Sequence, residues 1–323
     1  MDLTDDGGAS PRLAVLLCTH NGALHLIGQL TSLACQSQPP DFVYIHDWAS
    51  TDDTVELIEE FIRSEPAASC WQIARHDCAP GPGPSFLRAT ASCLDTNPSF
   101  DYLLFCDQDD LWHSDKLRMF AYALKKQPET QLIYSDVSLI DETGQLLAPR
   151  YLGPGGAFGR PMDIQHHATL FVNTVSGMSM GVSRELLERS RVVWQSHDWF
   201  MHDWLMTITA CLAELPVLFL PEILVKYRQH ANNAVGASSK QLALSSWPIL
   251  LNNARDFVLR VQSQYCGCVA LATAMQLQAL PPAMGRWQVA WTILTGRSLP
   301  PLKTLKVAIG FALFWSTDKG RCP

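Results

Sequence analysis

Three carboxylates stand directly after an apolar run near residue 107. The run Tyr102–Cys106 is rich in aromatic and branched side chains, as in a strand covered on both faces, and Asp107, Asp109 and Asp110 follow it. Carboxylates this close repel one another unless a cation lies between them, and Mg²⁺ or Mn²⁺ takes carboxylate oxygens together with substrate phosphates. The pattern therefore indicates a metal and diphosphate site. The alternative is that Asp109 and Asp110 only begin the helix predicted from about Ser114.

The elements that must position these carboxylates alternate between strand and helix. Apolar runs bounded by turn residues alternate with stretches whose apolar residues recur at helical spacing. The predicted strands are Leu13–Cys18, Phe42–Ile45, Trp71–Ala74 and Tyr102–Cys106, and the predicted helices are Ala23–Gln36, Val55–Ile62 and Ser85–Leu94, with a Pro/Gly loop over Pro80–Pro84. Such alternation implies a parallel sheet of the nucleotide-binding type, in which ligands collect at the carboxyl ends of the strands.

Short sequence blocks in a fixed order carry the most specific signal in the chain. They are Val15–Gly22, Asp47–Thr54, Phe105–Trp112, Ser176–Met180, His202–Leu205 and Tyr227–Asn233. Each block is weak alone, but together, over roughly residues 12–237, they resemble glycosyltransferase family 2 and, in detail, its bacterial rhamnosyltransferase-like branch. The resemblance implies an α/β fold of the GT-A type with a mostly parallel central sheet, a nucleotide-sugar donor and inversion at the anomeric carbon by direct displacement.

The resemblance also implies roles on the donor side. Thr19 and Asn21 would line the nucleotide pocket, and Asp47 would accept a hydrogen bond from the nucleobase, a task that suits an ionised carboxylate. The block after Asp47 departs from the family, which usually has a second acid and a glycine where this chain has Trp48 and Ala49. For Trp48 we favour packing under the loop over stacking on the base, because large aromatic side chains are more often structural.

A divalent cation, Mg²⁺ or Mn²⁺, is the cofactor that the resemblance implies. Asp109 would ligate the cation that bridges the two donor phosphates, and Asp107 would contact the ribose or the metal shell. Arg228 can pair with phosphate oxygens, and His230 would complete the cation site or touch the diphosphate. Other histidines, such as His25, are expected to be structural.

The acceptor side requires a base within reach of the acceptor hydroxyl. Asp203, which opens a predicted helix over Trp204–Leu215, is the preferred candidate, and Asp198 is held in reserve because His197–Trp199 nearly duplicates His202–Trp204. The competing interpretation is that Asp203 only caps the helix. Gly177, Met178 and Trp204 fall in blocks that the resemblance places on the acceptor side.

Composition limits the class of protein. The chain has 323 residues, 47% hydrophobic content and a formal net charge of −7, which argues against nucleic-acid binding. Scattered cysteines and a polar, acidic start favour a cytoplasmic protein with reduced thiols and no signal peptide. We expect a disordered leader over residues 1–11, a catalytic domain over 12–237 and a helical region over 238–323. The helical region either rests on the anionic cytoplasmic face of the inner membrane or packs on the catalytic domain.

The predicted function is transfer of a sugar, plausibly L-rhamnose from dTDP-rhamnose, onto a growing bacterial surface glycan such as O-antigen, core or capsule. The acceptor is a glycan or a lipid-linked glycan. Two alternatives stay open: a family 2 transferase that uses a UDP-sugar, and a non-catalytic scaffold that binds a nucleotide-sugar.

Overall fold

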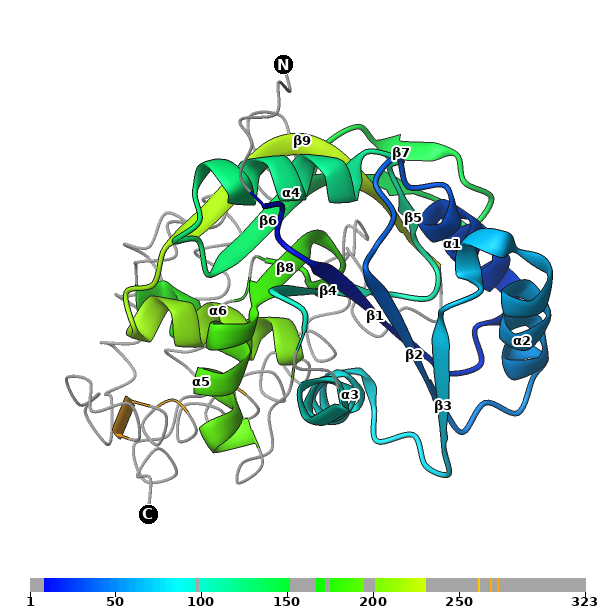
Figure 1. The fold of residues 1–323 in the computed structure, drawn as a ribbon, viewed down its shortest axis with the longest axis horizontal. Helices are drawn as coiled ribbons and strands as arrows, with labels where there is room; N and C mark the ends of the chain where they lie inside the picture. The colour runs from blue at the N-terminus through cyan, green and yellow to red at the C-terminus, as the bar shows by residue number, and fades with distance from the viewer. Residues whose placement is uncertain are drawn as a thin grey trace, which may run out of the picture.

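The computed structural model describes residues 9–96, 99–151, 167–171, 173, 175–194 and 201–230, together with 261, 268 and 272–273. In this part of the chain nine strands form one curled sheet in the order β3-β2-β1-β4-β8-β6-β9-β5, and β7 pairs with β6 (Figure 1). The strands are β1 Leu13–Thr19, β2 Phe42–Trp48, β3 Gln72–His76, β4 Tyr102–Cys106, β5 Leu111–Trp112, β6 Leu132–Ile140, β7 Leu146–Ala148, β8 Met180–Ser183 and β9 Val217–Arg228.

The first four strands form the predicted parallel sheet. β1 pairs in parallel with β2 and β4, and β2 with β3. β8 joins β4 and β6 in antiparallel fashion, which brings β6 and its parallel partner β9 back to the direction of β1. Six of the nine strands therefore run the same way, so the mostly parallel central sheet is confirmed.

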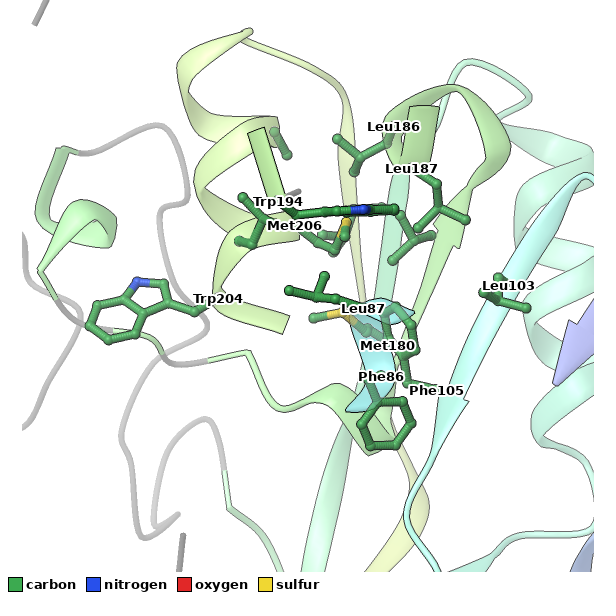
Figure 2. Packing of buried hydrophobic residues seen from close by; sticks show 14 of the residues in the cluster. Phe86, Leu87, Leu103, Phe105, Met180, Leu186, Leu187, Trp194, Trp204 and Met206 are labelled. Atoms are coloured by element: carbon green, nitrogen blue, oxygen red, sulfur yellow. The ribbon is translucent and has the colours of Figure 1, made fainter. Parts of the chain in front are cut away.

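Helices cover both faces of the sheet (Figure 1). They are α1 Ala23–Ala34, α2 Thr54–Ser64, α3 Pro82–Thr96, α4 Lys116–Lys126, α5 Arg184–Trp194 and α6 His202–Leu212, with short 3-10 turns η1 Pro66–Ala68, η2 His167–Leu170 and η3 Gly177–Ser179. Successive residues of β1 alternate between the two faces: Leu13, Val15 and Leu17 join the core under α1, α2 and α4, whereas Ala14 and Leu16 join the core under α3, α5 and α6. Figure 2 shows part of the second core, in which side chains of α3, β4, β8, α5 and α6 meet.

Two predicted boundaries were wrong. The Pro/Gly loop predicted at Pro80–Pro84 is partly helix, because α3 begins at Pro82. Prolines fit the first helical turn, whose N–H groups have no partner inside the helix, and Ser85 N–H makes a bond to the Gly81 carbonyl at 2.9 Å. The helix predicted from Ser114 begins at Lys116, after the short strand β5.

The predicted leader and C-terminal helical region fall mainly outside the described residues. Within the described residues, no helix combines the length and the apolar character that a membrane crossing requires.

Candidate functional site

The carboxyl ends of four strands hold most of the predicted donor-side residues. Thr19 and Asp47 are register partners at the ends of β1 and β2, Asp107 follows β4, and Arg228 ends β9. His20, in the loop after β1, contacts both neighbouring loops: its Nδ1 lies 2.6 Å from the last carbonyl oxygen of β2, and its backbone binds the loop after β4. The topology thus joins segments that are distant in the sequence.

Asp47 is buried and already well supplied with donors. Thr19 Oγ1 donates to its Oδ1 at 2.8 Å, and Ser50 donates through its hydroxyl at 2.5 Å and its N–H at 3.0 Å. Only 2% of Asp47 is exposed. Since a carboxylate offers about four acceptor positions, these three bonds leave one for a ligand.

Asn21 joins the loops after β1 and β2. Its Oδ1 accepts a bond from Thr51 N–H at 2.8 Å, and its own N–H donates to Ser50 Oγ at 2.9 Å. It adopts φ of 47°, in the left-handed region that asparagine tolerates better than most residues. The loop therefore explains Asn21 without a ligand, and contact with a nucleotide would be an additional role.

Trp48 packs in the interior, as predicted. It is 3% exposed, and its ring stacks on that of His76 with centroids 3.8 Å apart. His46 Nδ1 lies 2.9 Å from His76 Nε2, and burial followed by the nearby His76 lowers the pKa of His46 to about 4. Ala49 adopts φ of 54°, a left-handed conformation that explains the glycine usual at this place in the family.

Gln108 fastens the acidic loop to the loop after β1. Its Oε1 accepts from His20 N–H at 2.9 Å and its Nε2 donates to the His20 carbonyl at 3.1 Å. The Gln108 side chain passes so close to the backbone at position 22 that glycine is required there, because a Cβ would lie 2.2 Å from Gln108 Oε1. Sequence reasoning did not single out Gln108, since an amide between two aspartates has no distinctive pattern.

The three acids of this loop occupy different environments. Burial, followed by Asp109 and Asp203, raises the pKa of Asp107 to about 7. Asp110 is fully buried; its Oδ1 accepts from Arg228 N–H at 2.9 Å, and its Oδ2 has no hydrogen-bond partner among the described residues. Burial and the two neighbouring acids raise its pKa as well. None of the three begins a helix, so that alternative was wrong.

Asp109 and His230 form the part of the site best suited to a cation. His230 Nε2 lies 2.7 Å from Asp109 Oδ2, and the His25 ring, expected to be only structural, lies 5.3 Å from the His230 ring. Among the described residues no three His, Cys, Asp or Glu side chains are grouped closely enough to hold a metal by themselves. A carboxylate, an imidazole and a second acid nearby still fit an ion that takes its remaining ligands from phosphates.

Arg228 is 7% exposed and its guanidinium binds backbone carbonyl groups. Nε donates to the Asp109 carbonyl at 2.8 Å, and Nη1 donates to those of Asp141 and Glu142 at 3.2 and 3.0 Å. These bonds place positive charge under the acidic loop. A bond to a phosphate, the predicted role, would be made in addition to them or in their place.

Asp203 lies at the start of α6 and is 6% exposed. It is not the cap, because Met201 holds that position. Its Oδ2 accepts from Gly177 N–H at 3.0 Å and its Oδ1 from Trp204 N–H at 2.7 Å. Burial raises its pKa to about 6, against the lowering effect of these bonds. The reserve candidate Asp198 lies outside the described residues.

The acceptor-side residues divide into two groups. Gly177 and Met178 form η3 beside Asp203, and a Cβ on Gly177 would lie 2.6 Å from His202 Nε2. Trp204 is instead a core residue: it is 2% exposed, and its Nε1 donates to the Thr169 carbonyl at 2.6 Å. We predicted that Trp204 faces the acceptor. The structure does not support this, because its indole is buried in the core.

Two buried residues were missed. His202 stacks on Phe86 with centroids 4.1 Å apart, and neither ring nitrogen has a hydrogen-bond partner in the described part of the chain. Lys116 is fully buried at the start of α4. It lies four and eight residues before Phe120 and Leu124, which puts it on the apolar face of that helix. This spacing is the feature of the sequence from which its burial could have been predicted.

Comparisons with known proteins show the family of the chain. Residues 14–187 match the model of the family described as Glycosyl transferase family 2. The chain is 25% identical over 234 residues to a dTDP-rhamnosyl transferase RfbG from Shigella flexneri, covering 69% of this chain and 74% of that protein.

Solved structures resemble the fold. TarS 1-349 of S. aureus in complex with UDP-GlcNAc has a TM-score of 0.55 at 16% identity, covering 96% of this chain and 74% of that one. The mannosyltransferase PcManGT of Pyrobaculum calidifontis, in complex with GDP-Man and Mn²⁺, has a TM-score of 0.54 at 18% identity, covering 96% and 76%. The likeness to these structures confirms the predicted GT-A fold.

Proposed function

Because the chain belongs to glycosyl transferase family 2, we propose that it is an inverting transferase that moves a sugar from a nucleotide-sugar to a hydroxyl of a bacterial surface glycan. The observation that carries the proposal is the meeting of two acidic groups from distant parts of the chain. Asp203 is close enough to Asp107 to raise the pKa of the latter. A donor held by the acidic loop would therefore lie next to a buried carboxylate.

Asp203 is suited to act as the base. A buried carboxyl whose pKa is about 6 is ionised at neutral pH, yet holds a proton more strongly than an ordinary aspartate. In the proposed step the acceptor oxygen bonds to the anomeric carbon while the bond from that carbon to the phosphate oxygen breaks. The hydroxyl proton passes to Asp203, and the nucleoside diphosphate leaves.

The donor would lie across the ends of β1, β2, β4 and β9. Thr19, Asn21 and Asp47 would contact the nucleoside, and Asp107 the ribose or metal shell. Asp109 and His230 would hold Mg²⁺ or Mn²⁺, which supplies positive charge to the leaving diphosphate. Arg228 lies under the same loop and would add a fixed positive charge.

The proposed donor is dTDP-rhamnose. Similarity to a dTDP-rhamnosyl transferase supports it, whereas the two solved structures carry other donors and support only the fold. A UDP-sugar is the alternative donor within the family, and a non-catalytic scaffold the alternative outside enzymes. The retention of Asp107, Asp109 and Asp203 together favours the enzyme.

The place of action is proposed to be the cytoplasm, at the inner membrane, where lipid-linked glycan acceptors are made. The basic and aromatic residues of region 238–323 support contact with an anionic membrane surface. Packing of the same region on the catalytic domain is the alternative.

A thermal-shift panel tests the donor site. UDP, dTDP, UDP-sugars and dTDP-rhamnose are compared with and without Mn²⁺, using wild type, Asp109→Ala and, as a matched control, the partly exposed Asp115→Ala. A Mn²⁺-dependent rise in Tm with dTDP compounds, lost only in Asp109→Ala, is expected. A rise confined to UDP compounds would contradict the rhamnose assignment, and no rise with any compound would favour a protein that does not use nucleotide-sugars.

Donor hydrolysis then separates the enzyme from the scaffold. Asp203→Asn should bind the nucleotide as the wild type does and lose turnover. Equal hydrolysis by the two proteins would remove Asp203 from the role of base, and no hydrolysis or transfer by a wild type that binds donor would favour the scaffold.

A further inference from the structure

Lys116 places a buried amine between the acidic loop and the acceptor side. It is fully buried, and its Nζ donates to the Met178 carbonyl at 2.6 Å. The same Nζ lies 3.4 Å from the centroid of the Trp112 ring, at the end of β5, so the ammonium has an aromatic face on one side and a carbonyl on the other.

The surroundings of this amine include acidic groups of the loop after β4. Asp107 and Asp110 both act on it electrostatically, opposing the effect of burial, which lowers the pKa of Lys116 to about 7. A buried lysine is unfavourable unless something requires its charge or its donors, and an apolar side chain of the same volume would pack here at lower cost. The hydrogen bond to the Met178 carbonyl indicates that η3 requires this donor.

Met178 belongs to η3, which is held from two sides. Lys116 binds the turn through the Met178 carbonyl, and Asp203 binds it through Gly177 N–H at 3.0 Å. Close packing prevents the turn from sliding, since even a Cβ on Gly177 would lie 2.6 Å from the His202 ring. A displacement of η3 would therefore change the position or the hydrogen bonding of Asp203.

We propose that Lys116 is a positioning residue that fixes η3, and through it the Asp203 carboxylate, relative to the acidic loop. The role in catalysis rests on the proposed function, because it needs Asp203 as the base; the structural link does not. Lys116 itself contacts no substrate in this proposal. It belongs to α4, whose first residues follow the acidic loop, so it connects the donor side of the site to the acceptor side.

Amide hydrogen exchange tests the link independently of activity. Lys116→Met keeps the volume and removes the donor, and Lys126→Met, an exposed lysine of the same helix, is the matched control. In Lys116→Met, exchange in the peptide that holds residues 177–180 should become about tenfold faster, while that of β1 and β2 stays unchanged. Unchanged exchange at 177–180 would overturn the proposal, whether or not the protein proves to be a transferase.

Steady-state kinetics tests the consequence for catalysis. Lys116→Met should lower kcat about 10²-fold, because small misplacements of a catalytic group are costly, while KM for the donor stays within about threefold. Its Tm should stay within a few degrees of that of wild type, because the lost hydrogen bond is offset by the lower cost of burying an apolar side chain. A parallel loss of Tm and kcat, or an unchanged kcat, would show that Lys116 only packs the core and would overturn the role.

A second variant keeps the proposal testable if the first one misfolds. If Lys116→Met does not fold, Lys116→Gln, which keeps a neutral donor, is measured in the same way. Its 177–180 exchange should also be faster than that of wild type, because the amide is too short to reach the Met178 carbonyl at the same distance. A wild type without nucleotide-sugar turnover would refute the proposed function alone, and the exchange result would still decide the link.

Discussion

At the scale of single residues, the site is defined by carboxyl groups that burial keeps from behaving as ordinary acids. Asp107, Asp110 and Asp203 all have raised pKa values, with burial as the first cause in each case. Asp110 and Asp203 accept hydrogen bonds from backbone N–H groups, not from an exposed salt-bridge partner. Asp107 and Asp203, with pKa values of about 7 and about 6, change charge near neutrality, where ordinary aspartates do not.

The first prediction concerns Asp107 and the cation. Since its pKa is about 7, a cation that requires its ionised form must displace a proton at lower pH. Apparent affinity for Mn²⁺ with dTDP present should therefore rise with pH up to about 7 and level off above it. Calorimetry in two buffers of different ionisation enthalpy should find release of up to about one proton at pH 6. Asp107→Asn should reduce the release and the partly exposed Asp115→Asn should not; an unchanged release by Asp107→Asn would contradict the assignment.

The second prediction concerns Asp203. A base must be ionised, so kcat should fall about tenfold per pH unit below a pKa of about 6 and be level above it. Asp203→Asn should lower kcat by about 10²- to 10⁴-fold with unchanged nucleotide binding. Asp95→Asn, which alters an exposed carboxylate paired with Arg191, should leave the pH–rate profile unchanged. A wild-type profile that stays flat down to pH 5 would exclude Asp203 as the base.

At the scale of elements, loops at the ends of different strands lock one another in place. Asn21 and Ser50 connect the loops after β1 and β2, and Gln108 connects the loops after β1 and β4. No single loop would hold its conformation alone, because most of these bonds run between residues far apart in the sequence. These loops are therefore held in place by bonds within the protein itself.

The third prediction tests this connection at Gly22. Gly22→Ala places a Cβ 2.2 Å from Gln108 Oε1, so the glutamine must leave and lose its two bonds to His20. We expect a loss of about 1–2 kcal/mol in the free energy of unfolding, from denaturant titration. Gln108→Ala should lose a similar amount.

The double variant supplies the control. With the glutamine already truncated, Gly22→Ala should add little, so the two losses should not sum. Additive losses would mean that the alanine at position 22 disturbs something other than Gln108.

At the scale of the whole molecule, the sheet joins two parts of the chain. β1 to β4 form the parallel part that carries the proposed donor-side loops (Figure 1), and α6 and β9 carry Asp203 and Arg228. The region 238–323 adds basic and aromatic residues whose proposed task is contact with a membrane surface.

The fourth prediction tests that task with the full chain. The protein should cosediment with vesicles that contain anionic lipid, less so at high salt, and not with neutral vesicles. Lys303→Gln with Lys306→Gln should weaken binding by about 2 kcal/mol, roughly 30-fold, at about 1 kcal/mol per basic residue. Lys125→Gln with Lys126→Gln, the same charge change on α4, should have no effect. Equal binding to neutral vesicles, or none to either kind, would favour packing on the catalytic domain.

The sequence by itself determined the order of the strands and helices over residues 13–106, the acids at the strand ends and the family. These are local features: strand and helix periods, turn residues and short motifs can be recognised without knowing what lies opposite. The boundary at Pro82 was wrong because prolines and glycines signal a loop and a first helical turn equally well.

Only the tertiary structure decided which of these residues meet. It brought Asp203 within electrostatic range of Asp107 and His230 into contact with Asp109, buried Trp204 in the core, and gave Lys116 a carbonyl partner 62 positions away. The physical reason is that charge effects and hydrogen bonds depend on distance and burial in space. The sequence around a lysine on a helix does not tell whether water or a buried carbonyl accepts the hydrogen bond from its amine.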